Sequence, residues 1–75
     1  MTNLIRIYVH PNLPPRLEDM RKKIADDLKK RYNLDEITIN GGLVSQILAA
    51  KMNGRSFIDL KIRKTGLNKG VLELL

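Results

Sequence analysis

Residues 56–75 read SFIDLKIRKTGLNKGVLELL, and this stretch decides the fold of the C-terminal part of the chain. Aliphatic side chains occupy every second position in its first half, the period expected of a strand with one buried face. The central KTGLNKG combines two glycines with an asparagine and favours a turn. VLELL then predicts a closing strand, in which Glu73 must face water. The side chains expected to face the core are Ile58, Leu60, Ile62, Leu72 and Leu74.

The preceding sequence predicts two more strands and a long helix. Residues 4–10, LIRIYVH, alternate and predict a strand that Pro11 stops. Residues 16–32 carry apolar side chains three and four apart, which predicts a helix, and Asn33 can end it in a left-handed conformation. Residues 36–40, EITIN, predict a second short strand. The side chains expected to face inward are Ile5, Ile7, Val9, Leu17, Met20, Ile24, Leu28, Tyr32, Ile37 and Ile39.

A second helix is expected over residues 42–53, with Asn40 as its N-cap and Asn53-Gly54 at its end. Its sequence LVSQILAAKM is apolar almost all the way round, and such a helix is usually covered on more than one side. We expect the second cover to be another copy of the protein, because small domains without staples often gain stability by oligomerising. The residues of this candidate dimer interface are Val44, Ile47, Leu48 and Met52.

Together these elements predict a single small α+β domain over residues 1–75, of order β-α-β-α-β-β, with two helices on one face of a four-stranded sheet. The chain has no cysteine, which excludes disulfides and thiolate metal sites. Its apolar stretches are far shorter than the roughly 20 residues of a membrane span, and its N-terminus lacks the pattern of a secretory signal. We therefore expect a cytoplasmic protein that uses no membrane, metal or cofactor.

Positive charge is concentrated toward the C-terminus. Residues 51–69 hold six bases and one acid, a local balance of +5 within a net charge of +6. Such a surplus on one hairpin is typical of a surface that binds a polyanion. Protection of a sheet edge against aggregation, or simple solubility, explains the same pattern. The candidate nucleic-acid-binding residues are Lys51, Arg55, Lys61, Arg63, Lys64 and Lys69.

The first predicted helix also carries seven bases, but acids placed four residues ahead can neutralise several of them. The expected ion pairs are Glu18–Lys22, Asp19–Lys23, Asp26–Lys30 and Asp27–Arg31. We therefore interpret this helix as presenting a solvated face rather than a binding face.

Two smaller features allow more than one interpretation. Asn40, Gly41 and Gly42 lie at a strand-to-helix junction, where free N–H groups could hold a phosphate; the alternative is a tight turn with close helix packing, since no dinucleotide or Walker pattern follows. Tyr8 and Phe57 point outward from their strands. They could stack on bases, or instead pack in a dimer or cover the sheet.

No catalytic site or small-molecule substrate is expected. His10 is the only histidine, and no cysteine, serine or second histidine stands in motif spacing with it.

Residues 35–75 resemble the Alba-like family, to which the archaeal chromatin protein Alba and the C-terminal domain of translation initiation factor three belong. The resemblance lies in the succession of DEITIN, a glycine turn, GLVSQILAAKMNG, FIDLKI, a basic turn and VLELL. It implies a dimer whose last hairpin reaches along DNA, with Arg63, Lys64 and Lys69 on the nucleic acid. The chain departs from the family at HPNLPP, where a lysine-bearing loop is usual, and at the glycine turn, where arginine is common.

The sequence thus predicts a non-enzymatic protein that binds DNA or RNA with low sequence specificity through a basic C-terminal hairpin. The alternative is a homo-oligomeric structural or interaction module with no nucleic-acid role.

Overall fold

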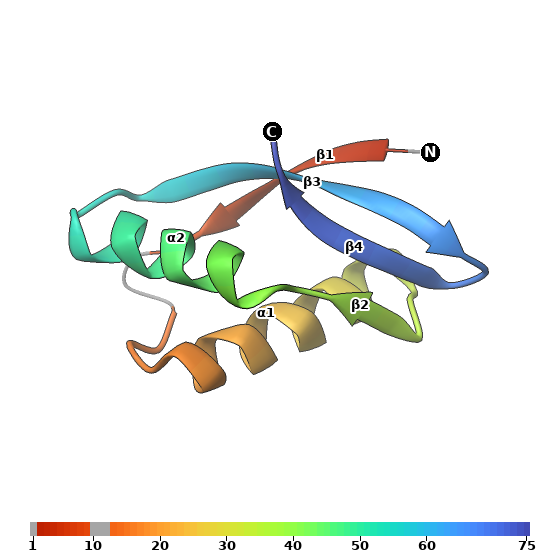
Figure 1. Ribbon diagram of the computed structural model, residues 1–75, viewed down its shortest axis with the longest axis horizontal. Helices are drawn as coiled ribbons and strands as arrows, with labels where there is room; N and C mark the ends of the chain where they lie inside the picture. The colour runs from red at the N-terminus through yellow and green to blue at the C-terminus, as the bar shows by residue number, and fades with distance from the viewer. Residues whose placement is uncertain (1, 10–12) are drawn as a thin grey trace.

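The computed structural model describes residues 2–9 and 13–75 and contains the six elements in the expected order (Figure 1). Their bounds are β1 Thr2–Tyr8, α1 Leu17–Tyr32, β2 Glu36–Thr38, α2 Gly41–Met52, β3 Phe57–Gly66 and β4 Lys69–Leu74. The predicted α+β class and element order are confirmed. The expected end of the first strand, at His10 and Pro11, lies outside the described residues.

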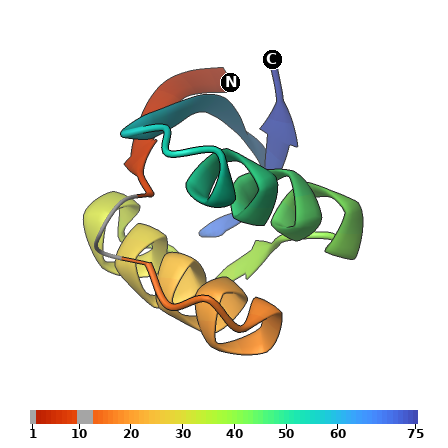
Figure 2. The ribbon, with the colours of Figure 1, turned by 90° about the vertical axis from the view of Figure 1, so that its left-hand side faces the viewer.

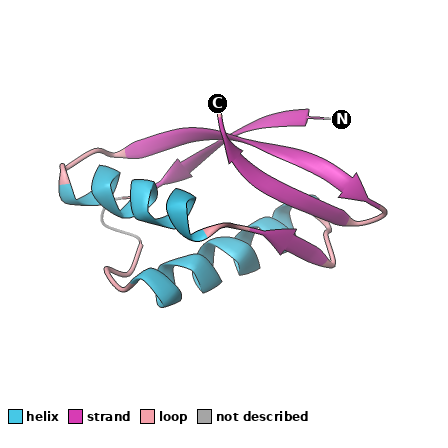
Figure 3. Cartoon of the chain, in the orientation of Figure 1, coloured by secondary structure: helices cyan, strands magenta, loops and turns pink. Residues whose placement is uncertain are grey.

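The four strands form one mixed sheet in the order β1-β3-β4-β2 (Figure 3). Strand β3 runs antiparallel to both β1 and β4, whereas β2 runs parallel to β4. Ile5 lies opposite Leu60, and Ile62 lies opposite Leu72, so the inward side chains of three strands meet in rows. The C-terminal hairpin, β3–β4, therefore occupies the centre of the sheet.

Both helices cover the same face of the sheet, and the core lies between the two layers (Figure 2). Met20 and Leu28 of α1, Ile47 of α2, and Leu60 and Leu72 of the sheet are fully buried. The sequence periods of two and of three to four predicted four of these positions; the exception is Ile47, which the sequence assigned to a dimer interface. Their burial removes apolar surface from water, which is the main term that stabilises a fold of this size.

Helix α2 packs against both β3 and α1, and these two contacts explain its apolar sequence (Figure 2). Val44 and Ile47 are buried in the protomer's own core, so the second cover expected from another copy is supplied by α1. The prediction that Val44 and Ile47 belong to a dimer interface is therefore wrong, because both side chains are buried within one protomer. Leu48 is partly buried, and Met52 is 78% exposed. Only these two remain accessible to a partner.

The last strand departs from the prediction at Leu74, which is 44% exposed instead of buried. Leu74 lies opposite Leu60 at the final rung of the hairpin, where β4 rises away from both helices (Figure 1). Alternation places its side chain on the inward face, but β4 is the edge strand at this rung, because β2 pairs only with residues 69–71 of β4. Leu17 of α1 is also exposed, since it begins its helix.

The turn between β3 and β4 is tighter than the seven-residue stretch expected. The strands extend to Gly66 and Lys69, which leaves Leu67 and Asn68 as the loop. Asn68 adopts the left-handed conformation at φ 57°, which asparagine tolerates better than most residues. Its carbonyl accepts hydrogen bonds from the backbone N–H groups of Asp35 at 2.8 Å and Glu36 at 3.3 Å, and so joins the hairpin tip to the start of β2.

Candidate nucleic-acid interface

One face of the sheet, here named the open face, is covered by neither helix (Figure 2). Residues paired across an antiparallel ladder share a face, and alternate residues of a strand point to opposite faces. The open face therefore carries Thr2, Leu4, Arg6 and Tyr8 from β1, Phe57, Asp59, Lys61 and Arg63 from β3, Lys69, Val71 and Glu73 from β4, and Glu36 and Thr38 from β2.

The six predicted binding residues do not form one cluster. Lys61, Arg63 and Lys69 lie on the open face. Lys64 lies opposite Gly70 and points to the helix side, where it lines a shallow depression with Tyr32. Alternation along β3 thus places Lys64 on the opposite side of the sheet from Lys61 and Arg63.

The end of α2 and the start of β3, which carry Lys51 and Arg55, lie at the opposite end of the molecule from the β3–β4 turn (Figure 1). Lys51 is in the last turn of α2, and Arg55 follows just before β3 begins. The ten residues of β3 then cover roughly 30 Å, at about 3.3 Å per residue. These two bases therefore do not join the hairpin bases, although they are neighbours in sequence.

Two of the hairpin bases have acidic partners on the open face. Arg63 donates to both carboxylate oxygens of Glu73, at 3.0 and 3.1 Å, and Lys69 lies 3.4 Å from Glu36. The hydrogen bond from Arg63 lowers the pKa of the Glu73 carboxyl, and the charges of Arg63 and Lys61 act in the same direction. Sequence reasoning missed both pairs, since their partners come from other strands.

Lys61 and Lys64 have no acid within 4 Å in the described part of the chain. Among residues 2–9 and 13–75, seven of the eight acids form ion pairs with seven of the fourteen bases. One acid, Asp35, and seven bases have no oppositely charged partner within 4 Å in these residues. Those bases are Lys22, Lys30, Arg31, Lys51, Arg55, Lys61 and Lys64. The unneutralised charge of the hairpin thus rests on Lys61 and Lys64.

Helix α1 neutralises part of its charge, as expected, but through other partners. The pairs are Arg16–Asp19, Glu18–Arg21, Lys23–Asp27 and Asp26–Lys29. None of the four predicted pairs forms among the described residues. Spacings of three and of four residues both bring side chains together on a helix. The sequence therefore shows which residues are charged, but not which acid pairs with which base.

The glycine turn lies at the start of α2, as predicted. Asn40 caps the helix, with its side-chain oxygen accepting from the Leu43 N–H at 2.8 Å. A methyl group at Gly41 would meet no atom within 4 Å, so close packing does not explain this glycine. Glu18 and Arg21, which pair with each other, line the depression beside Gly41. The turn therefore presents no surplus of positive side chains to a phosphate.

Tyr8 and Phe57 are direct partners in the β1–β3 ladder, an adjacency that the sequence leaves open. Their ring centroids are 6.4 Å apart, in an edge-to-face arrangement at 68°. The Arg6 guanidinium lies over the Phe57 ring, with Cζ 3.7 Å from the centroid. Arg6 also donates to both carboxylate oxygens of Asp59, at 2.8 and 3.2 Å, and this hydrogen bonding lowers the pKa of Asp59.

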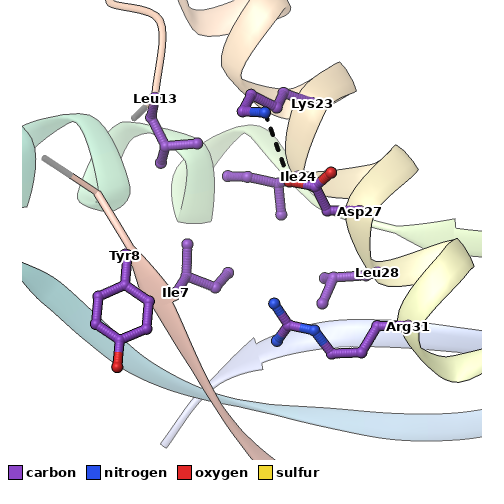
Figure 4. A pocket seen from close by; sticks show the side chains of 8 residues that line it. All are labelled: Ile7, Tyr8, Leu13, Lys23, Ile24, Asp27, Leu28 and Arg31. Carbon is purple, nitrogen blue, oxygen red and sulfur yellow. Dashed lines mark ion pairs between the residues drawn. The ribbon is translucent and has the colours of Figure 1, made fainter. Parts of the chain in front are cut away.

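A separate groove lies between β1 and α1 on the helix side of the sheet (Figure 4). Its volume is about 360 Å³, and Ile7, Ile24 and Leu28 contribute to its apolar lining. Tyr8 also lines it, so the groove reaches the end of β1 where the open face begins (Figure 4). Lys23 and Asp27 form an ion pair at its rim, 3.8 Å apart. Its described lining residues include no nucleophile beside a base, so this groove offers no arrangement for acyl or phosphoryl transfer.

In the part of the chain that the structure describes, no three histidine, aspartate or glutamate side chains come together as a metal site would require. Within the same residues, no helix has the length and apolar character needed to cross a membrane. Comparison with protein-family models, curated proteins and solved structures finds no match. The resemblance to the Alba-like family therefore stays a prediction.

Proposed function

We propose that the protein binds DNA or RNA non-enzymatically and with low sequence specificity, through the open face and the β3–β4 hairpin. The observation that supports this most is the charge left on the hairpin after pairing. Lys61 and Lys64 stand on opposite sides of β3 without an acidic partner among the described residues. Cations of this kind attract a phosphate backbone irrespective of base sequence.

The ion-paired bases of the hairpin add to this surface. Arg63 and Lys69 are held by exposed carboxylates, and exposed ion pairs contribute little free energy. A phosphate can therefore approach these bases from the solvent side. If four bases each neutralise one phosphate, the logarithm of affinity falls against the logarithm of salt concentration with a slope of about −3 to −4.

Two matched charge reversals test this proposal. The variant Lys61→Glu/Lys64→Glu changes the hairpin, and Lys51→Glu/Arg55→Glu makes the same change in net charge at the other end of the molecule. Fluorescence anisotropy with short duplex and single-stranded probes at several salt concentrations measures both. The hairpin variant should bind most weakly, with a salt slope reduced by about two, because two phosphate contacts are lost. The control should retain most of the binding.

Two outcomes contradict the proposal. A wild-type protein that binds none of the probes removes nucleic-acid binding altogether. Equal losses in the two variants would mean that net charge, rather than the hairpin, governs the binding. Circular dichroism of both variants checks that the fold is retained.

A homo-oligomeric interaction module is the second candidate, supported by the apolar side chains that α2 leaves accessible. Met52 is 78% exposed at the end of the helix, next to the partly buried Leu48. Light scattering of the wild type and of Met52→Lys tests this candidate. A dimer that the substitution dissociates supports it, and a monomeric wild type excludes it.

A further inference from the structure

The open face holds a layered group of side chains that charge alone does not explain. Tyr8 is 58% exposed and Phe57 is 38% exposed, although large aromatic rings are usually placed in cores. The ladder sets them directly opposite each other, at the end of the sheet where β1 ends and β3 begins. The two rings are steeply inclined to each other, at 68°, so each presents a separate surface, and Arg6 covers one side of Phe57.

Arg6 forms the outer layer of this group. Its guanidinium lies over Phe57 on one side and is fixed in its plane by two hydrogen bonds to Asp59. The Arg6 side chain is still 48% exposed, so a ligand can reach part of it from the solvent side. A guanidinium has five N–H donors, and the Asp59 carboxylate uses two of them. The other three point outward from the edge of the plane, where they can donate to a phosphate or carbonyl oxygen beside a stacked base.

Arg6 lies beside a shallow depression whose lining is mostly apolar but includes the Asp59 carboxylate. Leu4 and Leu75 are both strongly exposed, and together with Arg6 they line a depression of about 290 Å³. Lys61 lies directly opposite Leu4 in the ladder, so a cation without an acidic partner in the described residues adjoins this depression. The site therefore combines a stacking plane, an apolar recess and a charge for a phosphate.

We propose that the open face prefers single-stranded nucleic acid, with unpaired bases stacked on Arg6 and Tyr8 and the adjoining phosphates near Lys61. This inference rests on the proposed function and adds the class of ligand to it. Bases in a duplex hide their flat sides against one another, whereas single strands can offer them to aromatic and guanidinium planes. Stacking of this kind contributes about tenfold or more in affinity per base.

The decisive substitution is Arg6→Lys, which keeps the charge and removes the plane. Arg63→Lys is its matched control, since Arg63 is also held by two hydrogen bonds to a carboxylate on the open face. Tyr8→Leu removes the second stacking surface and retains an apolar side chain in the strand. Each protein is titrated with a 12-nucleotide single strand of DNA, the corresponding RNA, and a DNA duplex of the same length.

We expect Arg6→Lys and Tyr8→Leu each to weaken binding to the single strands about tenfold, with the salt slope and the duplex affinity unchanged. Arg63→Lys should leave the ratio of single-strand to duplex affinity at the wild-type value. Tight binding of either DNA or RNA single strands supports the proposal. Urea denaturation of each variant verifies that these exposed substitutions leave the fold intact.

Two results would overturn the inference while leaving the proposed function in place. One is a wild-type protein that binds duplex as tightly as single strands; the other is an Arg6→Lys variant that matches Arg63→Lys in every titration. A wild-type protein that binds no probe instead removes the proposed function itself.

Discussion

The two faces of the sheet are made by the same four strands but are held together in different ways. The helix side is joined by buried aliphatic side chains such as Ile5, Leu60 and Leu72. The open face is joined by ion pairs between strands: Arg6–Asp59 links β1 to β3, Arg63–Glu73 links β3 to β4, and Lys69–Glu36 links β4 to β2. Each pair of neighbouring strands thus has one charge pair on this face.

The two faces of the sheet have different roles in stability and strand alignment. Apolar burial is non-directional and supplies most of the stability, whereas exposed ion pairs contribute little free energy. The charge pairs instead favour one alignment, because a slip of one residue moves every side chain to the other face and separates the partners. We therefore expect substitutions on the helix side to change stability, and substitutions on the open face to change mainly register and binding.

The largest expected effect comes from Leu60→Ala, which deletes a fully buried side chain in the central strand. It should lower the free energy of unfolding by about 2–5 kcal/mol, since it removes apolar contacts and leaves a cavity. Its neighbour Lys61 provides the control, because Lys61→Ala on the open face should change that free energy by no more than about 0.5 kcal/mol. Urea denaturation measures both, and similar losses would contradict the division between the faces.

A smaller effect is expected from Asn40→Ala, which removes the N-cap of the helix nearest the sheet. The Leu43 N–H loses its hydrogen-bond acceptor, so the free energy of unfolding should fall by about 1 kcal/mol. Asn40→Asp is the control, since aspartate can also cap the helix and its charge suits the N-terminus. If both variants lost the same stability, the role assigned to the cap would be wrong.

The smallest effect concerns the pH dependence of the open face. Hydrogen bonds from Arg6 and Arg63 lower the pKa values of Asp59 and Glu73. Carboxyls with lowered pKa values stabilise the fold fully above their ordinary values, and this contribution is lost as the pH falls through the lowered ones. Urea midpoints measured from pH 7 down to acid should therefore fall less steeply in Asp59→Asn/Glu73→Gln than in the wild type.

Asp35→Asn provides the comparison for that experiment, because Asp35 has no base within 4 Å among the described residues. The wild-type and control midpoints should change together with pH. A double variant that also followed them would show that the cross-strand pairs add nothing to stability.

Local sequence patterns predicted the elements of this fold well. The alternation of Ile5, Ile7 and Val9 and the capping residue Asn40 are short-range signals, and the structure confirms them. Asn33 also ends α1 in the left-handed conformation, at φ 54°, as its position predicts.

The candidate site was predicted less well, because its geometry depends on which strands become neighbours. The Glu73 and Glu36 partners of Arg63 and Lys69 follow from the strand order β1-β3-β4-β2, which no local pattern specifies. The same order separates Arg55 from the hairpin tip and places Tyr8 against Phe57. The sequence shows where the basic residues lie along the chain, but it does not show where they lie on the surface of the folded protein.

The central position of the last hairpin has a consequence for how the chain folds as it is synthesised. Strands β1 and β2 emerge first, yet they do not pair with each other; β1 pairs with β3, and β2 pairs with β4. While only residues up to the end of α2 have been synthesised, neither β1 nor β2 has its pairing partner, so the helices have no sheet to pack against. The sheet can therefore form only after residues 57–74 have left the ribosome. Until then, the apolar sides of both helices can be shielded from water only by each other or by a chaperone.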